Sequence, residues 1–152
     1  MKKSTFWNVF FVILTVLVFV SLFAFRGKIS SFLSESKKAE TAKNLDESEK
    51  NKYENEYNYS DQANGYKYTF LEFGAKSCVA CKKMEEVLKI VGEDHPEVNV
   101  VFHNVTTKEG QNYADYYGVV MIPVQVILDK TGKEIFRHEG YISAEDLSIN
   151  FK

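Results

Sequence analysis

The sequence predicts an α/β domain, with a mixed sheet and flanking helices, that follows one apolar segment near the N-terminus. β-rich runs and amphipathic helical stretches alternate from about residue 66 onward. An uncharged apolar run fills residues 5–25, and a polar, charged stretch separates it from the domain. The 152 residues therefore have room for one domain of ordinary size and its attachments, but not for two full domains.

The apolar run extends from Thr5 to Phe25, after Lys2 and Lys3 and before Arg26. A helix of this length spans about 30 Å, which is the thickness of the hydrocarbon core of a bilayer. Trp7 lies near one end of the run, where an indole suits the membrane interface. We therefore interpret residues 1–26 as an N-terminal membrane anchor.

A cleaved signal peptide is the alternative interpretation of this run. Its apolar region would be shorter, roughly 7–15 residues, and would end in a small-x-small cleavage site. Leu22, Phe23 and Phe25 place bulky side chains where small ones are needed. The length and the missing cleavage site favour an uncleaved anchor.

The charges that flank the run bear on its orientation in the membrane. Lys2 and Lys3 indicate a cytoplasmic N-terminus, whereas Arg26, Lys28 and Lys37 indicate the reverse under the positive-inside rule. We expect the first arrangement because a very short, basic N-terminus resembles a signal sequence. The domain would then lie outside the cytoplasm, in an oxidising compartment where disulfides form and a dithiol has substrates.

Residues 27–65 are rich in Lys, Glu, Asn, Ser and Asp and show no regular apolar stripe. Such a composition is typical of a solvated helix or a flexible tether, so we expect a spacer between the membrane and the domain. The sequence leaves one alternative open: the tyrosines near Tyr57 could pack on the domain as a short strand or helix.

Residues 66–152 form the predicted globular domain. Apolar patterning, caps and turn residues predict its elements in the order β-α-β-α-β-β-α. The expected strands are Lys67–Gly74, Val98–Val105, Val124–Leu128 and Glu134–His138, and the expected helices are Cys78–Val91, Glu109–Tyr117 and a short one after Ser143. Phe73 and Tyr141 are expected in the core.

Cys78 and Cys81 are the only cysteines in the chain, and they lie at the start of the first helix of the domain. Two thiols about one helical turn apart can close a small disulfide ring. The free N–H groups and the dipole of a helix N-terminus stabilise a thiolate, so Cys78 is the expected nucleophile, with Lys76 and Lys82 adding positive potential. This pattern indicates a dithiol–disulfide exchange site.

Several other functions are disfavoured by composition and spacing. Two cysteines do not make a disulfide-stapled scaffold, and a structural zinc site would need more ligands. His95, His103 and His138 are scattered, so we expect surface or hydrogen-bonded histidines, with no metal and no organic cofactor. A net charge of -2 and a pI near 6.0 argue against nucleic acid as a partner.

The order of strand, Cys-x-x-Cys, helix and a distant Pro before a hairpin resembles the thioredoxin family, over roughly Tyr66 to Ile149. Leu71 to Ala75 resembles the central strand of that family, and Tyr117 to Val124 resembles its cis-proline segment. Lys130 to Lys133 resembles its hairpin. The resemblance implies a thioredoxin-like mixed sheet flanked by helices.

The resemblance also implies roles for individual residues. Cys78 would attack a substrate disulfide and Cys81 would resolve the mixed disulfide. Glu72 matches the buried acid of the family, which exchanges a proton with the resolving thiol; the alternative is an exposed glutamate at a strand end. Pro123 would be cis and would leave the backbone of Ile122 free to pair with a substrate strand.

Two departures from the family concern the motif itself: Ser77 stands where Trp is usual, and Val79-Ala80 replaces Gly-Pro. With its anchor, the chain is similar to membrane-tethered thioredoxin-like proteins of bacteria. That similarity implies a reductase of protein disulfides, of the cytochrome c maturation or disulfide repair type, supplied by a membrane thiol electron donor. The alternatives are a disulfide-forming oxidase and a tethered copper chaperone.

Overall fold

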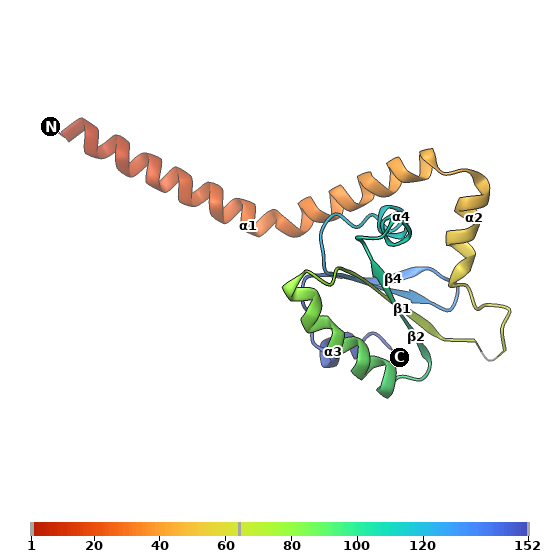
Figure 1. The fold of residues 1–152 in the computed structure, drawn as a ribbon. Helices are drawn as coiled ribbons and strands as arrows, with labels where there is room; N and C mark the ends of the chain where they lie inside the picture. Colours follow the sequence, from red (N-terminus) through yellow and green to blue (C-terminus); the bar gives the residue numbers. More distant parts are fainter. Residues whose placement is uncertain (1, 64, 152) are drawn as a thin grey trace.

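The computed structural model describes residues 2–63 and 65–151, and its globular part is built on a four-stranded mixed sheet (Figure 1). The strands are β1 (Tyr68–Gly74), β2 (Val98–Asn104), β3 (Val124–Asp129) and β4 (Glu134–Glu139), in the spatial order β2-β1-β3-β4. β1 runs parallel to β2 and antiparallel to β3, and β3 runs antiparallel to β4. The predicted α/β class is confirmed.

Helices cover both faces of this sheet. They are α1 (Lys2–Asn44), α2 (Glu47–Glu56), α3 (Val79–Asp94), α4 (Lys108–Tyr116) and α5 (Ala144–Ser148). α3 and α5 pack on one face, whereas α2, α4 and the second half of α1 lie on the other (Figure 1). The strands and helices predicted for the globular part are all present, with ends shifted by a few residues.

β1 is buried on both faces, which explains its nearly continuous apolar sequence. Leu71 and Phe73 pack in the core on the side of α2 and α4. Phe70 packs in the core on the side of α3 and α5. Because side chains alternate along a strand, Glu72 lies on the same face as Phe70, toward α3.

α3 is held on the sheet by one apolar stripe. Met84, Val87 and Val91 are buried at helical spacing and pack in one core cluster with Phe70 and Ile127. Burying each such side chain contributes about 1.5–3 kcal/mol. This packing fixes the N-terminus of α3 beside the ends of the strands.

Residues 27–65 differ from the expected spacer because most of the segment is helical and packs on the domain. α1 continues without a break to Asn44, and α2 follows after a short connection. Tyr53 and Tyr57 are 7% and 5% exposed and share a core cluster with Tyr113. The structure therefore has the packed arrangement that the sequence left open for the tyrosines.

The second half of α1 docks on the domain through polar contacts. The Lys37 ammonium donates a hydrogen bond to the carbonyl of Val119 and pairs with Asp115, both at 2.8 Å. The Lys38 ammonium pairs with Glu134 at 3.0 Å. Contacts of this kind leave no apolar periodicity, which is why the sequence pattern did not predict the docking.

The first part of α1 is different in character. The segment Trp7–Phe25 is long enough and apolar enough to cross a membrane, and none of it is buried against the protein. It extends away from the globular domain (Figure 1). By length and composition it is a candidate membrane anchor.

Gly118 gives a test of the α1 docking. It has φ +66°, and a Cβ there would collide with the carbonyl oxygen of Ser34 in α1. Gly140 has φ +93° but open space around its Cβ position. We expect Gly140→Ala to cost about 1–2 kcal/mol of unfolding free energy from backbone strain alone. Gly118→Ala should cost at least about 1 kcal/mol more because α1 must move.

Chemical denaturation of the full chain in detergent micelles measures both variants. Equal losses for Gly118→Ala and Gly140→Ala would contradict the docking of α1 on the domain.

Candidate active site

The cysteine motif lies at the edge of the sheet where β1 ends. Cys78 caps the N-terminus of α3, and its N–H donates to the carbonyl of Ala75 at 3.0 Å. A Cβ built on Gly74, the last residue of β1, would lie 3.3 Å from both Cβ and Sγ of Cys81. The backbone of β1 and the second cysteine are therefore in close contact, as the motif requires for a compact site.

Cys78 and Cys81 form a disulfide, with their Cα atoms 5.2 Å apart. Cys78 is partly exposed, whereas Cys81 is only 4% exposed. The backbone N–H of Cys81 donates to Sγ of Cys78 at 3.2 Å. After reduction, a negative charge on the Cys78 sulfur would be stabilised by this N–H and by the N-terminal end of α3, an arrangement that favours Cys78 over Cys81 as the nucleophile.

Glu72 is fully buried on the α3 face of β1, so the alternative of an exposed strand-end glutamate is wrong. Its Oε2 accepts a hydrogen bond from Nε2 of Gln125, the residue opposite it on β3, at 2.9 Å. Burial raises the pKa of Glu72 to about 8, and the hydrogen bond only partly opposes this. Glu72 therefore holds its proton at neutral pH and can exchange it under mildly alkaline conditions.

Sequence reasoning missed the role of Gln125. The side chain is fully buried, and its amide is the hydrogen-bond donor for the Glu72 carboxyl group. Oε1 of Glu72 and Oε1 of Gln125 have no partner among the described residues. A polar residue inside the apolar run Val124–Leu128 was the available signal, because a buried amide needs a polar partner.

The segment before β3 reaches the same edge of the sheet. The Ile122–Pro123 peptide bond is cis, and the carbonyl of Pro123 accepts a hydrogen bond from the N–H of Gly140 at 2.8 Å. Phe73 pairs in register with Val124 in antiparallel β1 and β3. Pro123, one residue before Val124, therefore lies level with Gly74, at the end of the sheet where the cysteines are. The tertiary structure thus brings both predicted segments, the cysteine motif and the proline, to one edge.

Exposed apolar side chains surround this edge. Val79, between the cysteines, is 74% exposed, and Met121, before Ile122, is 51% exposed. Tyr141 is 52% exposed, so its expected core position is wrong: it follows Gly140, beyond the last residue of β4, where the chain leaves the sheet. Phe73 is fully buried, as expected.

The histidines are hydrogen-bonded, as expected. His103 is buried between the rings of Phe73 and Tyr113, and its Nε2 lies 3.1 Å from the hydroxyl of Tyr57. Burial lowers the pKa of His103 to about 4, so the ring is neutral. Among the side chains that the structure describes (residues 7–25, 27–63 and 65–151), no group of three or more His, Cys, Asp or Glu is placed to hold a metal ion.

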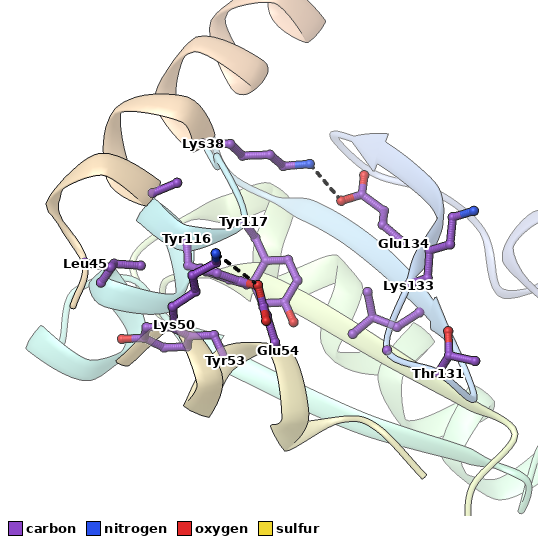
Figure 2. A pocket seen from close by; sticks show the side chains of 13 residues that line it. Lys38, Leu45, Lys50, Tyr53, Glu54, Tyr116, Tyr117, Thr131, Lys133 and Glu134 are labelled. Carbon is purple, nitrogen blue, oxygen red and sulfur yellow. Dashed lines mark hydrogen bonds and ion pairs between the residues drawn. The ribbon is translucent and has the colours of Figure 1, made fainter. Parts of the chain in front are cut away.

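A cavity lies elsewhere, between α1, α2, α4 and the β3–β4 turn. Its volume is about 470 Å³, and Figure 2 shows Tyr53, Tyr117 and Glu134 among the side chains that line it. The ion pairs Lys38–Glu134 and Lys50–Glu54 border it. None of the redox residues lines this cavity, so it belongs to the α1 docking surface and not to the thiol chemistry.

Comparisons with known proteins agree with this geometry. The family model of the thioredoxin-like domain matches residues 59–152. A thioredoxin of Nicotiana alata is 30% identical, with a TM-score of 0.54; the match covers 66% of this chain and 83% of that one. No curated protein matches the sequence significantly.

Two further solved structures share the fold. A mutant thioredoxin of Halobacterium salinarum is 24% identical, with a TM-score of 0.50, over 55% of this chain and 71% of that one. Thioredoxin-2, described as a component of malaria parasite protein secretion machinery, is 19% identical, with a TM-score of 0.52, over 56% and 81%.

The buried carboxyl group predicts a pH-dependent stability. Between the ordinary pKa of 4.5 and about 8, the folded chain keeps the Glu72 proton and the unfolded chain loses it. The contribution of the Glu72 proton to the free energy of unfolding is therefore complete below pH 4.5. It declines as the pH rises to about 8, by no more than about 1.4 kcal/mol per pH unit. Glu72→Gln should remove this decline.

Chemical denaturation of the oxidised full chain in micelles at about pH 5, 6.5 and 8 measures the effect. Glu86→Gln, at an exposed position on α3, is the matched control and should keep the wild-type slope. A Glu72→Gln protein with an unchanged slope would contradict the buried-acid assignment.

Proposed function

The chain belongs to the thioredoxin-like domain family, and on that premise we propose that it is a membrane-anchored, extracytoplasmic enzyme that reduces protein disulfides. Its fold and its Cys-x-x-Cys pair make it a thiol–disulfide oxidoreductase. The observation that carries the proposal is the unequal exposure of Cys78 and Cys81 at the N-terminus of α3.

The reaction starts from the reduced dithiol. The Cys78 thiolate attacks one sulfur of a substrate disulfide, and the other substrate sulfur leaves as a thiolate. Cys81, once deprotonated, attacks Sγ of Cys78 in the resulting mixed disulfide and expels the second substrate thiolate. The substrate gains two electrons, and the enzyme ends in the Cys78–Cys81 disulfide form.

A dithiol donor must then return two electrons to the enzyme. The proposed donor is a membrane protein with a thiol pair, which attacks the Cys78–Cys81 disulfide and becomes oxidised itself. No organic cofactor takes part. The cellular task proposed for this cycle is cytochrome c maturation or disulfide repair.

Glu72 is the proposed proton acceptor for Cys81. Three features support this role: its burial on the α3 face, the contact of Gly74 in the same strand with Cys81, and a pKa raised to about 8 by burial. Once deprotonated, a carboxylate with such a pKa is a stronger base toward a thiol than an ordinary glutamate, so this proton transfer is favoured under mildly alkaline conditions.

Ile122 and Pro123 are the proposed substrate-binding residues. Ile122 is partly exposed, and no backbone hydrogen bond engages its N–H or C=O within residues 2–63 and 65–151. An extended substrate segment could therefore pair with this backbone beside the cysteines, as in strand addition. Exposed Val79 and Met121 add an apolar surface for the segment.

Membrane attachment is the remaining part of the proposal. The exposed apolar segment Trp7–Phe25 supports it, and the basic Lys2 and Lys3 support an N-terminus on the cytoplasmic side. The domain, which follows the segment, would then face the extracytoplasmic side.

Removal of the resolving thiol should trap substrates. We expect Cys81→Ser in cells to accumulate mixed disulfides through Cys78, on the order of tenfold above wild type, because the second attack is lost. Non-reducing electrophoresis followed by mass spectrometry identifies the partners. Cys78→Ser is the matched control and should trap none, since its accessible nucleophile is missing. An empty Cys81→Ser trap with copper binding that requires both thiols would support a copper chaperone instead.

The direction of electron flow follows from the reduction potential. For a reductase we expect a value near that of thioredoxin, about −270 mV, measured by equilibration of the Cys78–Cys81 pair with glutathione or dithiothreitol buffers. A value near −120 mV would make the protein an oxidase and contradict the proposed direction.

A further inference from the structure

We propose that the docked half of α1 turns one edge of the sheet toward the membrane, namely the edge that carries Cys78, Cys81 and Pro123, which we call the redox edge. The partner of this protein is then a membrane protein whose disulfide or dithiol lies at the membrane–water interface. The inference rests on the proposed membrane attachment and defines the partner surface of the same site. Its basis is the direction in which α1 crosses the domain.

Two contacts with β4 define that direction. The hydroxyl of Ser30 donates to the carboxylate of Glu139, the last residue of β4. Eight positions later along α1, Lys38 pairs with Glu134, the first residue of β4. α1 therefore runs opposite to β4, from the edge of the sheet where β4 ends to the edge where it begins.

The redox site lies at the first of these edges. Glu139 pairs in register with Val124, directly after Pro123, and the neighbouring N–H of Gly140 donates to the carbonyl of Pro123. Gly74, at the same end of the sheet, contacts Cys81. The end of α1 that enters from the membrane segment and the disulfide thus share one edge of the domain.

The start of α3 also lies toward the side from which the long first part of α1 leaves the domain (Figure 1). Phe25, the end of the candidate span, precedes Ser30 by five residues. Five residues of helix rise only about 8 Å. The redox edge is therefore close to the membrane surface, and a large water-soluble substrate has little room between the two.

α1 is held firmly enough to keep this arrangement. Ser34 is 2% exposed, and its carbonyl lies against Gly118, where a Cβ would clash. Lys37 holds the carbonyl of Val119 in the loop that leads to Ile122. Further along, the hydroxyl of Thr41 donates to a backbone carbonyl of α4 at 3.1 Å. The same helix therefore supports the substrate-binding loop and sets its height above the membrane.

Exposed apolar side chains gather toward this end of the molecule. On α1 beyond the span, Ile29 is 46% and Phe32 71% exposed, and on the redox edge Val79, Met121 and Tyr141 are each more than half exposed. A surface of this kind is costly in bulk water but suits the interfacial part of a membrane protein. This apolar surface suits a partner whose reacting sulfur atoms lie at the membrane–water interface.

The proposal is tested first by lifting the domain. An insertion of 18 helix-forming residues after Gly27 adds about five helical turns and raises the domain by about 27 Å without rotating it. In full-length Cys81→Ser protein in cells, we expect at least tenfold less mixed disulfide with membrane partners. The same insertion after Lys3, before the span, is the matched control and should trap as before. Unchanged trapping after the Gly27 insertion, or trapped partners that are all water-soluble, would overturn the inference.

A direct measurement of depth does not depend on the insertion. In full chains with both cysteines replaced by serine, a fluorophore is attached through Met121→Cys or through Thr131→Cys, in the β3–β4 turn at the opposite end of the sheet. In liposomes with a headgroup-linked quencher, we expect the label at 121 to be quenched at least threefold more strongly. Equal quenching, or stronger quenching at 131, would contradict the orientation.

Two controls separate this inference from the proposed function. Wild-type full chain in micelles, first reduced with dithiothreitol and freed of the excess, should reduce a small aromatic disulfide and end in the Cys78–Cys81 disulfide form. A membrane-impermeant thiol reagent should label reduced Cys78 in intact cells or spheroplasts. If either control fails, the proposed enzyme activity or sidedness is wrong and the inference falls with it. If both succeed and the two labels are quenched equally, only the orientation is wrong.

Discussion

The close contact between the last residue of β1 and the second cysteine is the constraint on which the site depends. A Cβ at Gly74 would lie only 3.1 Å from the ring of Phe102 and 3.3 Å from Cys81, which is tighter than nearly all Cβ contacts in proteins, so these neighbours would have to shift by a few tenths of an ångström. With glycine there, the first turn of α3 can lie directly on the strand end. The helix N-terminus, the disulfide and the buried face that carries Glu72 are then brought together at one edge of the sheet.

Glu72 and Gln125 form a buried polar pair on the face of the sheet that α3 covers. Burying this pair costs folding free energy, and the same burial changes the pKa of the Glu72 carboxyl group. Glu72 and Gln125 lie opposite each other in a core that otherwise consists mainly of apolar side chains, with one hydrogen bond between them. Desolvation disfavours the charged carboxylate and so raises its pKa into the range in which a thiol can exchange protons with it. An apolar pair at these positions would stabilise the fold but would remove the proton acceptor that we propose for Cys81.

The second half of α1 connects the candidate membrane segment to the globular domain and packs on that domain. Its lysines contact backbone and carboxylate groups on α4, on the loop before β3 and on β4. Each ion pair is partly exposed and contributes little by itself. Together with the close approach of Gly118 to the carbonyl of Ser34, these ion pairs define one position for α1 on the domain. That position fixes how the redox edge lies relative to the candidate membrane segment Trp7–Phe25.

The sequence alone determined the order of the strands and helices from β1 to α5, because apolar periodicity and turn residues are local signals. It also determined the dithiol at the start of α3, since Cys78 and Cys81 are close together in the chain. Only the tertiary structure decided that Gln125 pairs with Glu72 and that Lys37 and Lys38 bind the domain. Those partners are far apart in sequence and polar, so no periodicity marks them, and packing alone brings them together.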